Sequence, residues 1–358
     1  MSLTTRTRAR HLVRTMLDLA SRWLIAALMC LGMGLPAIAC EIPPDMRTDL
    51  PPGGANEATE VTASFSVVDF MGVDDENQRI EIDFFMRMYW TDPRLADSAG
   101  CRFGVTEVWF PRIRLLNSDQ LRVAYRNARN QVAVGPGGRV EYTQRFTGAV
   151  SSYHNLSRFP FDSHQFSIDF VNVEEPNNLV DFVPDQENTW IADRLNIEGW
   201  TVGDARLETG ALTFRRTELE LEMISLIIDA KRNPQFYIYR LISLLTLVVA
   251  MSWVIFWVPP SQFEFQIGIG ATTMLTAMAF IFAISSQLPP VGYLTTLDKL
   301  VIWAIVLIFL SIVEALVAGR MVLAGREQLA LKLDRASRFV FPALLVGGWA
   351  LAISGWNG

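Results

Sequence analysis

Four long apolar stretches in the last third of the chain limit what this protein can fold into. Each is long enough to cross a hydrocarbon core about 30 Å thick as a helix. By residue number they cover 237–258, 267–287, 300–318 and 339–356. Because the chain has 358 residues, a large part must lie outside the membrane. The sequence predicts a transmembrane domain over residues 234–358, preceded by a larger domain in water.

The first 39 residues have the three parts of an export signal. A basic region with four arginines ends at Arg14, an apolar core covers residues 23–35, and residues 37–39 (Ala-Ile-Ala) fit the small-x-small cleavage pattern. We therefore expect residues 1–39 to be a signal peptide. Residues 41–233 should then fold on the outer side of the membrane.

Two cysteines, Cys40 and Cys101, remain after the predicted cleavage site. In an exported chain they can pair with each other, and lipidation of Cys40 is the alternative. Ala37 argues against lipidation, because lipoprotein signals usually have Leu there. Two cysteines cannot build a disulfide framework, so the fold must depend on its core.

Basic residues between the third and fourth apolar stretches orient the membrane domain. This linker contains Arg320, Arg326, Lys332, Arg335 and Arg338. Such a segment stays in the cytoplasm. With an exported N-terminal domain, this arrangement predicts a multi-pass protein of a bacterial inner membrane, with the N-terminal domain in the periplasm.

The segment from Glu60 to Arg232 alternates short β-rich runs with turn signals. Candidate strands cover residues 61–70, 79–90, 139–146 and 218–230. Many short strands without a long amphipathic helix predict an all-β, immunoglobulin-like sandwich.

The exported segment is acidic. Residues 41–232 contain 31 acidic and 19 basic residues, a balance of −12. Such a surface concentrates cations and repels anions, so we expect no nucleic-acid partner. The alternative is an acidic surface that serves only solubility.

Enzyme chemistry has little support in the sequence. Only His154 and His164 remain after the signal, and the sequence has no Cys-x-x-Cys, no His-Glu-x-x-His and no Gly-rich phosphate loop. We expect no catalytic residues, cofactor or metal. Either histidine can sense protons, with His164 the better candidate because it lies beside Asp162. A structural role is the alternative.

The second apolar stretch carries a stripe that a plain membrane anchor does not need. Steps of three and four residues place its members on one face of a helix. They are Glu264, Gly268, Thr272, Leu275, Ala279, Phe282 and Ser286. A ring of such helices would enclose a water path with a charged mouth and an apolar constriction, as an ion pore needs. The alternative is that the hydroxyls bond their own helix and the large apolar side chains face neighbouring helices.

Three motifs resemble those of the pentameric ligand-gated ion channels, the Cys-loop receptor superfamily. Residues 90–95 (Trp-Thr-Asp-Pro-Arg-Leu) resemble the Trp-x-Asp-x-Arg-Leu signature, residues 159–162 (Phe-Pro-Phe-Asp) have the family's spacing, and residues 232–234 (Arg-Asn-Pro) resemble its junction into the first membrane helix. Ser152 and Phe166 occupy the positions of the loop cysteines. The resemblance is therefore to the cysteine-free prokaryotic type, and it is closest to the amine-gated bacterial member.

This resemblance implies a homopentamer around a central pore. Each subunit would have an outer β-sandwich and a four-helix transmembrane bundle, with the stripe from Glu264 lining the pore. Glu264 corresponds to the acid at this level in a proton-gated bacterial member, which supports cation selectivity. The implied partners are four identical subunits, a small-molecule agonist, monovalent cations and membrane lipid.

The resemblance also implies a coupling element between the two domains. It places Asp162 in contact with Arg232, and pairing compensates two charges that are costly to bury alone. The expected members are Phe159, Pro160, Phe161, Asp162, Arg232, Pro289, Pro290 and Tyr293, with Asp74, Asp75 or Glu76 as a third charged member. A static structural salt bridge is the alternative.

The agonist pocket departs from the family's pattern. Related channels hold amines over aromatic rings, but here mainly Phe85 keeps an aromatic side chain. The expected pocket residues are Phe85, Arg114, Leu116, Val171, Val173, Leu207 and Phe214. Phe214 and its neighbours Arg215 and Arg216 suit an acidic ligand, with solvated loop residues as the alternative.

The sequence therefore predicts a ligand-gated, cation-selective ion channel. The alternatives are a non-conducting membrane receptor and a channel gated mainly by protons.

Overall fold

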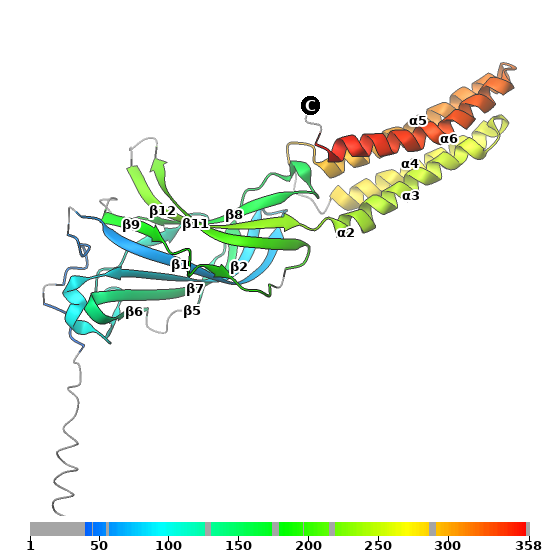
Figure 1. Ribbon diagram of the computed structural model, residues 1–358. Helices are drawn as coiled ribbons and strands as arrows, with labels where there is room; N and C mark the ends of the chain where they lie inside the picture. The colour runs from blue at the N-terminus through cyan, green and yellow to red at the C-terminus, as the bar shows by residue number, and fades with distance from the viewer. Residues whose placement is uncertain are drawn as a thin grey trace, which may run out of the picture.

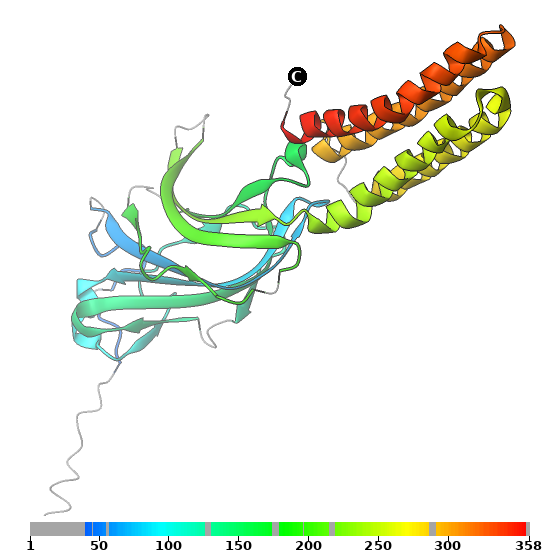
Figure 2. The same ribbon diagram turned by 45° about the vertical axis from the view of Figure 1, so that its right-hand side comes forward.

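The computed structural model has two parts placed end to end, a β-rich part and a bundle of long helices (Figure 1). The second view shows the same elongated arrangement (Figure 2). The structure describes residues 40–44, 46–54, 57–125, 130–173, 179–195, 197–214, 219–285 and 291–355. The predicted signal peptide, Ser286, Pro289 and Pro290 lie outside the described residues.

The β-rich part consists of two sheets. In the described residues the larger sheet has the strand order β10-β1-β2-β7-β6-β3, with β5 paired to β7 and β9 paired to β1. Its strands are β1 (Thr59–Asp74), β2 (Arg79–Thr91), β3 (Arg102–Gly104), β5 (Arg122–Tyr125), β6 (Gln131–Val134), β7 (Arg139–Ser151), β9 (Val180–Pro184) and β10 (Trp190–Ile191). The smaller sheet has the order β11-β12-β8-β4. Its strands are β4 (Ile113–Leu115), β8 (Ser163–Asn172), β11 (Trp200–Phe214) and β12 (Leu219–Arg232). The predicted all-β sandwich is confirmed.

Alternation along the strands builds the core between the sheets. In β2 every second residue from Ile80 to Trp90 is buried, while Arg87 is exposed. Aromatic rings from both sheets meet there, with the centroids of Phe65 and Phe170 5.5 Å apart. Burying side chains of this size contributes roughly 1.5–3 kcal/mol each, so this core can hold the sandwich together.

Four helical segments follow, each long and apolar enough to cross a membrane, as predicted. The first runs through α2 (Gln235–Tyr237), a π-helical turn, α3 (Ser243–Ser252) and a 3₁₀ turn that ends at Trp257. It is followed by α4 (Phe263–Ser285), α5 (Thr296–Leu323) and α6 (Glu327–Ile353). In α5 the first turn is fixed by a capping box between Thr295 and Asp298.

The last helix is longer than the sequence predicts. It begins at Glu327, so most of the predicted basic linker before residue 339 is helix, and the real turn lies near Gly325, whose φ is +75°. Hydropathy detects only the apolar part of a helix, and the first turns of α6 are charged. One face of them is nevertheless buried, with Asp334 and Ser337 against α5, where the Ser337 hydroxyl donates to Glu314 Oε1 at 3.2 Å.

A disulfide joins Cys40 to Cys101, which settles the pairing that the sequence left open. It ties the start of the described chain to the residue before β3, and Cys101 is buried in the core. The bond closes a loop with a sequence separation of 61.

We expect Cys101→Ser to lower the free energy of unfolding of the sandwich by about 2–4 kcal/mol, since a cross-link over a loop of this length limits the unfolded chain. Chemical denaturation followed by tryptophan fluorescence measures this. Cys40→Ser and the double variant serve as controls, because each breaks the same bond. If the free energy of unfolding lost in the double variant equals the sum of the two single losses, the pairing of Cys40 with Cys101 is contradicted.

Candidate functional site

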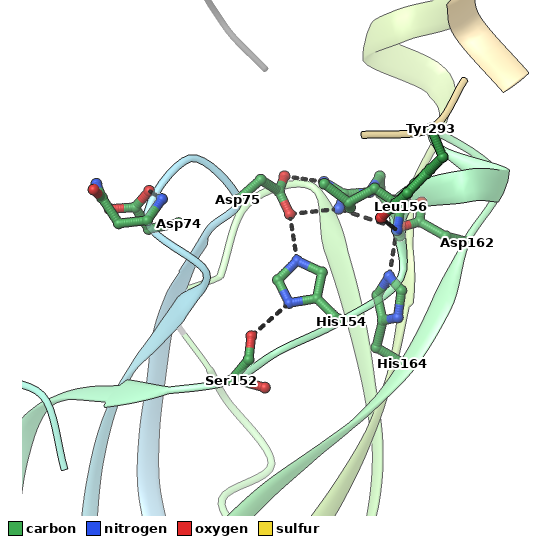
Figure 3. Close-up of polar contacts among 10 residues, drawn as sticks. Asp74, Asp75, Ser152, His154, Leu156, Asp162, His164 and Tyr293 are labelled. Atoms are coloured by element: carbon green, nitrogen blue, oxygen red, sulfur yellow. Dashed lines mark hydrogen bonds and ion pairs between the residues drawn. The ribbon is translucent and has the colours of Figure 1, made fainter. Parts of the chain in front are cut away.

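A buried arginine joins three chain segments where the sandwich meets the helices. Arg232 is the last residue of β12, Asp75 directly follows β1, and Asp162 directly precedes β8. Nε of Arg232 donates to Asp162 Oδ1 at 2.8 Å, and its Nη1 and Nη2 donate to the two carboxylate oxygens of Asp75 at 2.7 and 2.8 Å. Figure 3 shows both carboxylates turned toward this one group. We call Arg232, Asp75 and Asp162 the arginine clamp.

Aromatic rings complete the surroundings of the guanidinium. Cζ of Arg232 lies 4.1 Å from the ring centroid of Trp200 and 4.7 Å from that of Phe159. The side chain of Arg232 is 3% exposed and that of Asp162 is 2% exposed. The planar guanidinium suits this environment, because it can bind carboxylates in pairs and stack on rings at the same time.

The clamp fixes the charge of its members. Burial alone would raise the pKa of Asp162, but hydrogen bonds and charge from His164 and Arg232 lower it to about 2. The pKa of Asp75 is also lowered, against burial, by His154 and Arg232. The pKa of Arg232 is raised by the two carboxylates although burial opposes this. Since the pKa of Asp162 lies below the ordinary 3.8, its contribution to stability is present above that pH and is lost as the pH falls toward 2.

Two histidines lie against the clamp (Figure 3). His154 Nε2 is 3.0 Å from Asp75 Oδ1, and His164 Nε2 is 2.6 Å from Asp162 Oδ2. Both imidazoles are buried or nearly so. The sequence singled out His164, and the structure shows that His154 has an equivalent contact with the other carboxylate.

The loop before β8 enters the helical domain. Leu156 and Phe159 are fully buried in the core formed by the helices. The Leu156 amide donates to the hydroxyl of Tyr293 at 2.8 Å, and the Leu297 amide donates to the Phe159 carbonyl at 3.1 Å. A displacement of this loop would therefore act directly on the start of α5 through these hydrogen bonds.

The predicted coupling residues do not all meet. Asp74 points away from the clamp and instead binds Asn77 and Arg79, because it closes the turn between β1 and β2. Pro160 is buried and Phe161 is half-buried in the loop beside Asp162. Trp200 was not anticipated, and no linear motif marks it, since it comes from a strand paired with the end of β12.

The stripe on α4 occupies one uncovered face of the subunit. All six of its described members are exposed, including Leu275 at 72% and Phe282 at 78%. The opposite face packs on the other helices through Gln266, Gly270, Thr273 and Ala277, which are buried. Thr272 donates to the Gly268 carbonyl at 2.9 Å, so its hydroxyl bonds its own helix while remaining on the exposed face.

Most of the predicted pocket residues lie on or beside the smaller sheet, where Leu116 directly follows β4 and Val173 directly follows β8, while Phe85 lies in β2 of the larger sheet. Leu116 and Val173 are exposed, whereas Val171 is buried in the sheet opposite Arg114 and does not face a surface. Leu207 is half-buried, and the side chain of Phe214 lies outside the described part.

Phe85 has a cationic neighbour that the sequence did not reveal. Cζ of Arg145 lies 5.4 Å from its ring centroid, and Arg145 is paired with Asp83. The register of β2 with β7 places Arg145 directly opposite Phe85.

We expect Arg232→Gln to lower the free energy of unfolding by about 3–5 kcal/mol, because it leaves two carboxylates buried without their cation. Chemical denaturation of the purified protein measures this. Arg206 is a matched control, since it also binds two carboxylates, those of Glu208 and Asp229, but at the surface. Arg206→Gln should cost less than about 1 kcal/mol. Equal losses in the two variants would show that burial of the clamp does not matter.

Comparison with known proteins gives a consistent picture. The family model described as the neurotransmitter-gated ion-channel ligand binding domain matches residues 46–233, and that of the neurotransmitter-gated ion-channel transmembrane region matches residues 245–337. A proton-gated ion channel of Gloeobacter violaceus is 24% identical over 306 residues, which are 83% of this chain and 83% of that protein.

Animal receptors are also similar. The human gamma-aminobutyric acid receptor subunit rho-3 is 22% identical over 273 residues, 74% of this chain, and the Caenorhabditis elegans gamma-aminobutyric acid receptor subunit beta is 22% identical over 285 residues, 75% of this chain. The alignments span only 58% and 50% of those subunits. None of these relatives is named as an amine-gated channel, so the closer resemblance to the amine-gated bacterial member stays a prediction. Because the two family models together match well over half of the 358 residues, the chain belongs to the neurotransmitter-gated ion-channel family, a family of pentameric ligand-gated ion channels and not of enzymes.

Proposed function

We propose that five copies of this chain form a cation-selective channel in a bacterial inner membrane. In this proposal an agonist binds between adjacent sandwiches and opens a pore lined by α4. The observation that carries the proposal is the exposed stripe on α4, which combines an acid, hydroxyl and small residues and large apolar side chains on one face. A carboxylate on a face turned to lipid is expensive, so this face suits a water-filled path.

The direction of the helices orients the pore. The start of α5 contacts the sandwich through Leu297, while the turn before α4 lies at the far end of the bundle (Figure 1). Glu264, in the first turn of α4, is therefore at the end distant from the sandwich. With the sandwich in the periplasm, Glu264 faces the cytoplasm.

The apolar part of the stripe suits a gate. Leu275, Ala279 and Phe282 lie between the middle of α4 and its end nearest the sandwich, and all three are exposed. Five copies of such side chains would form a narrow ring from which water withdraws when the pore is closed.

The arginine clamp suits the link between agonist and gate. It joins the end of β1, the loop before β8 and the end of β12 shortly before the first helix, and the loop before β8 also contacts Tyr293. An agonist that binds one arrangement of the sandwich more tightly shifts the closed–open equilibrium through these contacts.

A channel gated mainly by protons is the second candidate. It is favoured by the name of the Gloeobacter relative and by the two histidines beside the clamp. Recording from purified pentamers in planar bilayers, over a screen of small amines, small acids and pH, distinguishes the candidates. Pentamers without current under every condition would instead support a non-conducting receptor.

We expect Glu264→Gln to reduce the preference for cations. A carboxylate about 6 Å from a cation in water contributes roughly 0.7 kcal/mol, which corresponds to about a threefold preference. Reversal potentials under a salt gradient measure the ratio of cation to anion permeability. Glu327→Gln is the matched control, because Glu327 is exposed near the same end of the bundle but outside α4. If Glu264→Gln leaves the ratio of cation to anion permeability unchanged, Glu264 does not determine the preference for cations.

We expect Leu275→Ala to favour the open state, because it shortens five apolar side chains at the constriction. Openings without agonist, or opening at several-fold lower agonist concentration, would show this in bilayer recordings. Met278→Ala is the control, since Met278 is on α4 but off the stripe. If the channel with Leu275→Ala closes as tightly as the unchanged channel, the constriction lies elsewhere.

A further inference from the structure

The two histidines at the arginine clamp have a hydrogen-bonding pattern that the proposed function does not explain. They are two of the three histidines in the chain, and His11 lies in the predicted signal peptide. His154 lies in the loop before β8, and His164 lies in β8, two residues after Asp162. Their ring centroids are 4.8 Å apart, so they act as one pair.

Both ring nitrogens of His154 face oxygens that only accept hydrogen bonds. Nδ1 is 2.9 Å from the Ser152 carbonyl oxygen, and Nε2 is 3.0 Å from Asp75 Oδ1. Asp75 is ionised, because hydrogen bonds from His154 and Arg232 lower its pKa although burial opposes them. A neutral imidazole has a single N–H and satisfies one of these acceptors, whereas an imidazolium satisfies both. The geometry therefore fits the protonated ring.

The net charge of the clamp also favours a protonated histidine. Arg232 contributes one positive charge and the two carboxylates contribute two negative charges, so the buried group has a net charge of −1 while both histidines are neutral. An uncompensated buried charge is strongly unfavourable. One proton on the histidine pair brings the net charge to zero.

A second proton is disfavoured. Two imidazolium rings 4.8 Å apart would repel each other in a buried site. His164 can remain neutral and still donate from Nε2 to Asp162 Oδ2.

Among the described residues, the other charged groups on the packed elements are exposed or paired elsewhere. Lys231 of β12 is exposed, and Asp229 binds Arg206. Asp74 is bound to Arg79 on the far side of the turn, and Tyr237 from α2 packs on Phe159. Phe166 and Trp200 contact the histidine rings as apolar neighbours. A surface cavity of about 500 Å³ lined by His164, Asp229 and Lys231 gives His164 access to water.

We propose that His154 and His164 form a proton-binding site that takes up one proton and thereby holds Asp75 against Arg232. The proton comes from bulk water and adds to Nε2 of His154, and no other bond changes. Without this proton two acceptors face each other, and the link from β1 to the first helix is weaker. The consequence for gating rests on the proposed channel function, whereas the protonation state does not.

Solid-state NMR on the full-length pentamer in lipid, with ¹⁵N-labelled histidine, tests the protonation state. His164→Gln and His154→Gln assign the two rings. We expect the ring of His154 in His164→Gln protein to carry protons on both nitrogens at pH 7. A bare Nε2 on His154 at that pH, in the unchanged protein and in His164→Gln protein, overturns the proposal.

Bilayer recordings separate this inference from the channel assignment. Imidazolium signals in a pentamer that carries no current would keep the proton site and reject the channel. Currents from a pentamer with a neutral His154 would keep the channel and reject the proton site. If His154→Gln does not assemble, the spectra of the unchanged protein and of His164→Gln decide.

Discussion

The burial of the Arg232 guanidinium is the constraint on which the rest of the structure depends. A cation in the apolar boundary between sandwich and helices is stable only if carboxylates meet it there, and two do. Asp75 comes from the end of β1 and Asp162 from the loop before β8. Three segments that are far apart in the sequence must therefore converge at the point where β12 ends, and the first helix can start in only one position relative to the sandwich.

Part of this site was visible in the sequence, and the limit of that visibility has a physical reason. The Phe-Pro-Phe-Asp motif and the Arg-Asn-Pro junction predicted the contact between Asp162 and Arg232, which the structure contains. The choice between Asp74 and Asp75 was not predictable, because successive residues at a strand end point in different directions and the turn decides which one faces the clamp. The contact of His154 with Asp75 was also hidden, since it depends on how two loops are folded against each other.

In the membrane domain, too, some features could be predicted from the sequence and others could not. The spacing of three and four residues from Glu264 correctly separates an exposed face of α4 from a buried one, because helical periodicity is a local property. The start of α6 was missed, since charged residues can continue a helix that hydropathy alone does not detect. The agonist pocket stays a prediction. Its expected residues come from different strands, and strand register decides which of them reach a surface, as the buried Val171 shows.

The two kinds of contact at the boundary have different physical roles. Leu156 and Phe159 are buried among the helices, so sandwich and bundle share apolar contacts that transmit displacement without selecting a direction. The arginine clamp has discrete geometry, because paired N–H···O bonds are either made or broken. Coupling between distant sites requires an element with two distinct arrangements, and close-packed apolar contacts by themselves provide continuity rather than a switch. In the proposed proton site the net charge of the clamp depends on one proton. This would supply the second arrangement, at the position where the shared apolar contacts reach the start of α5.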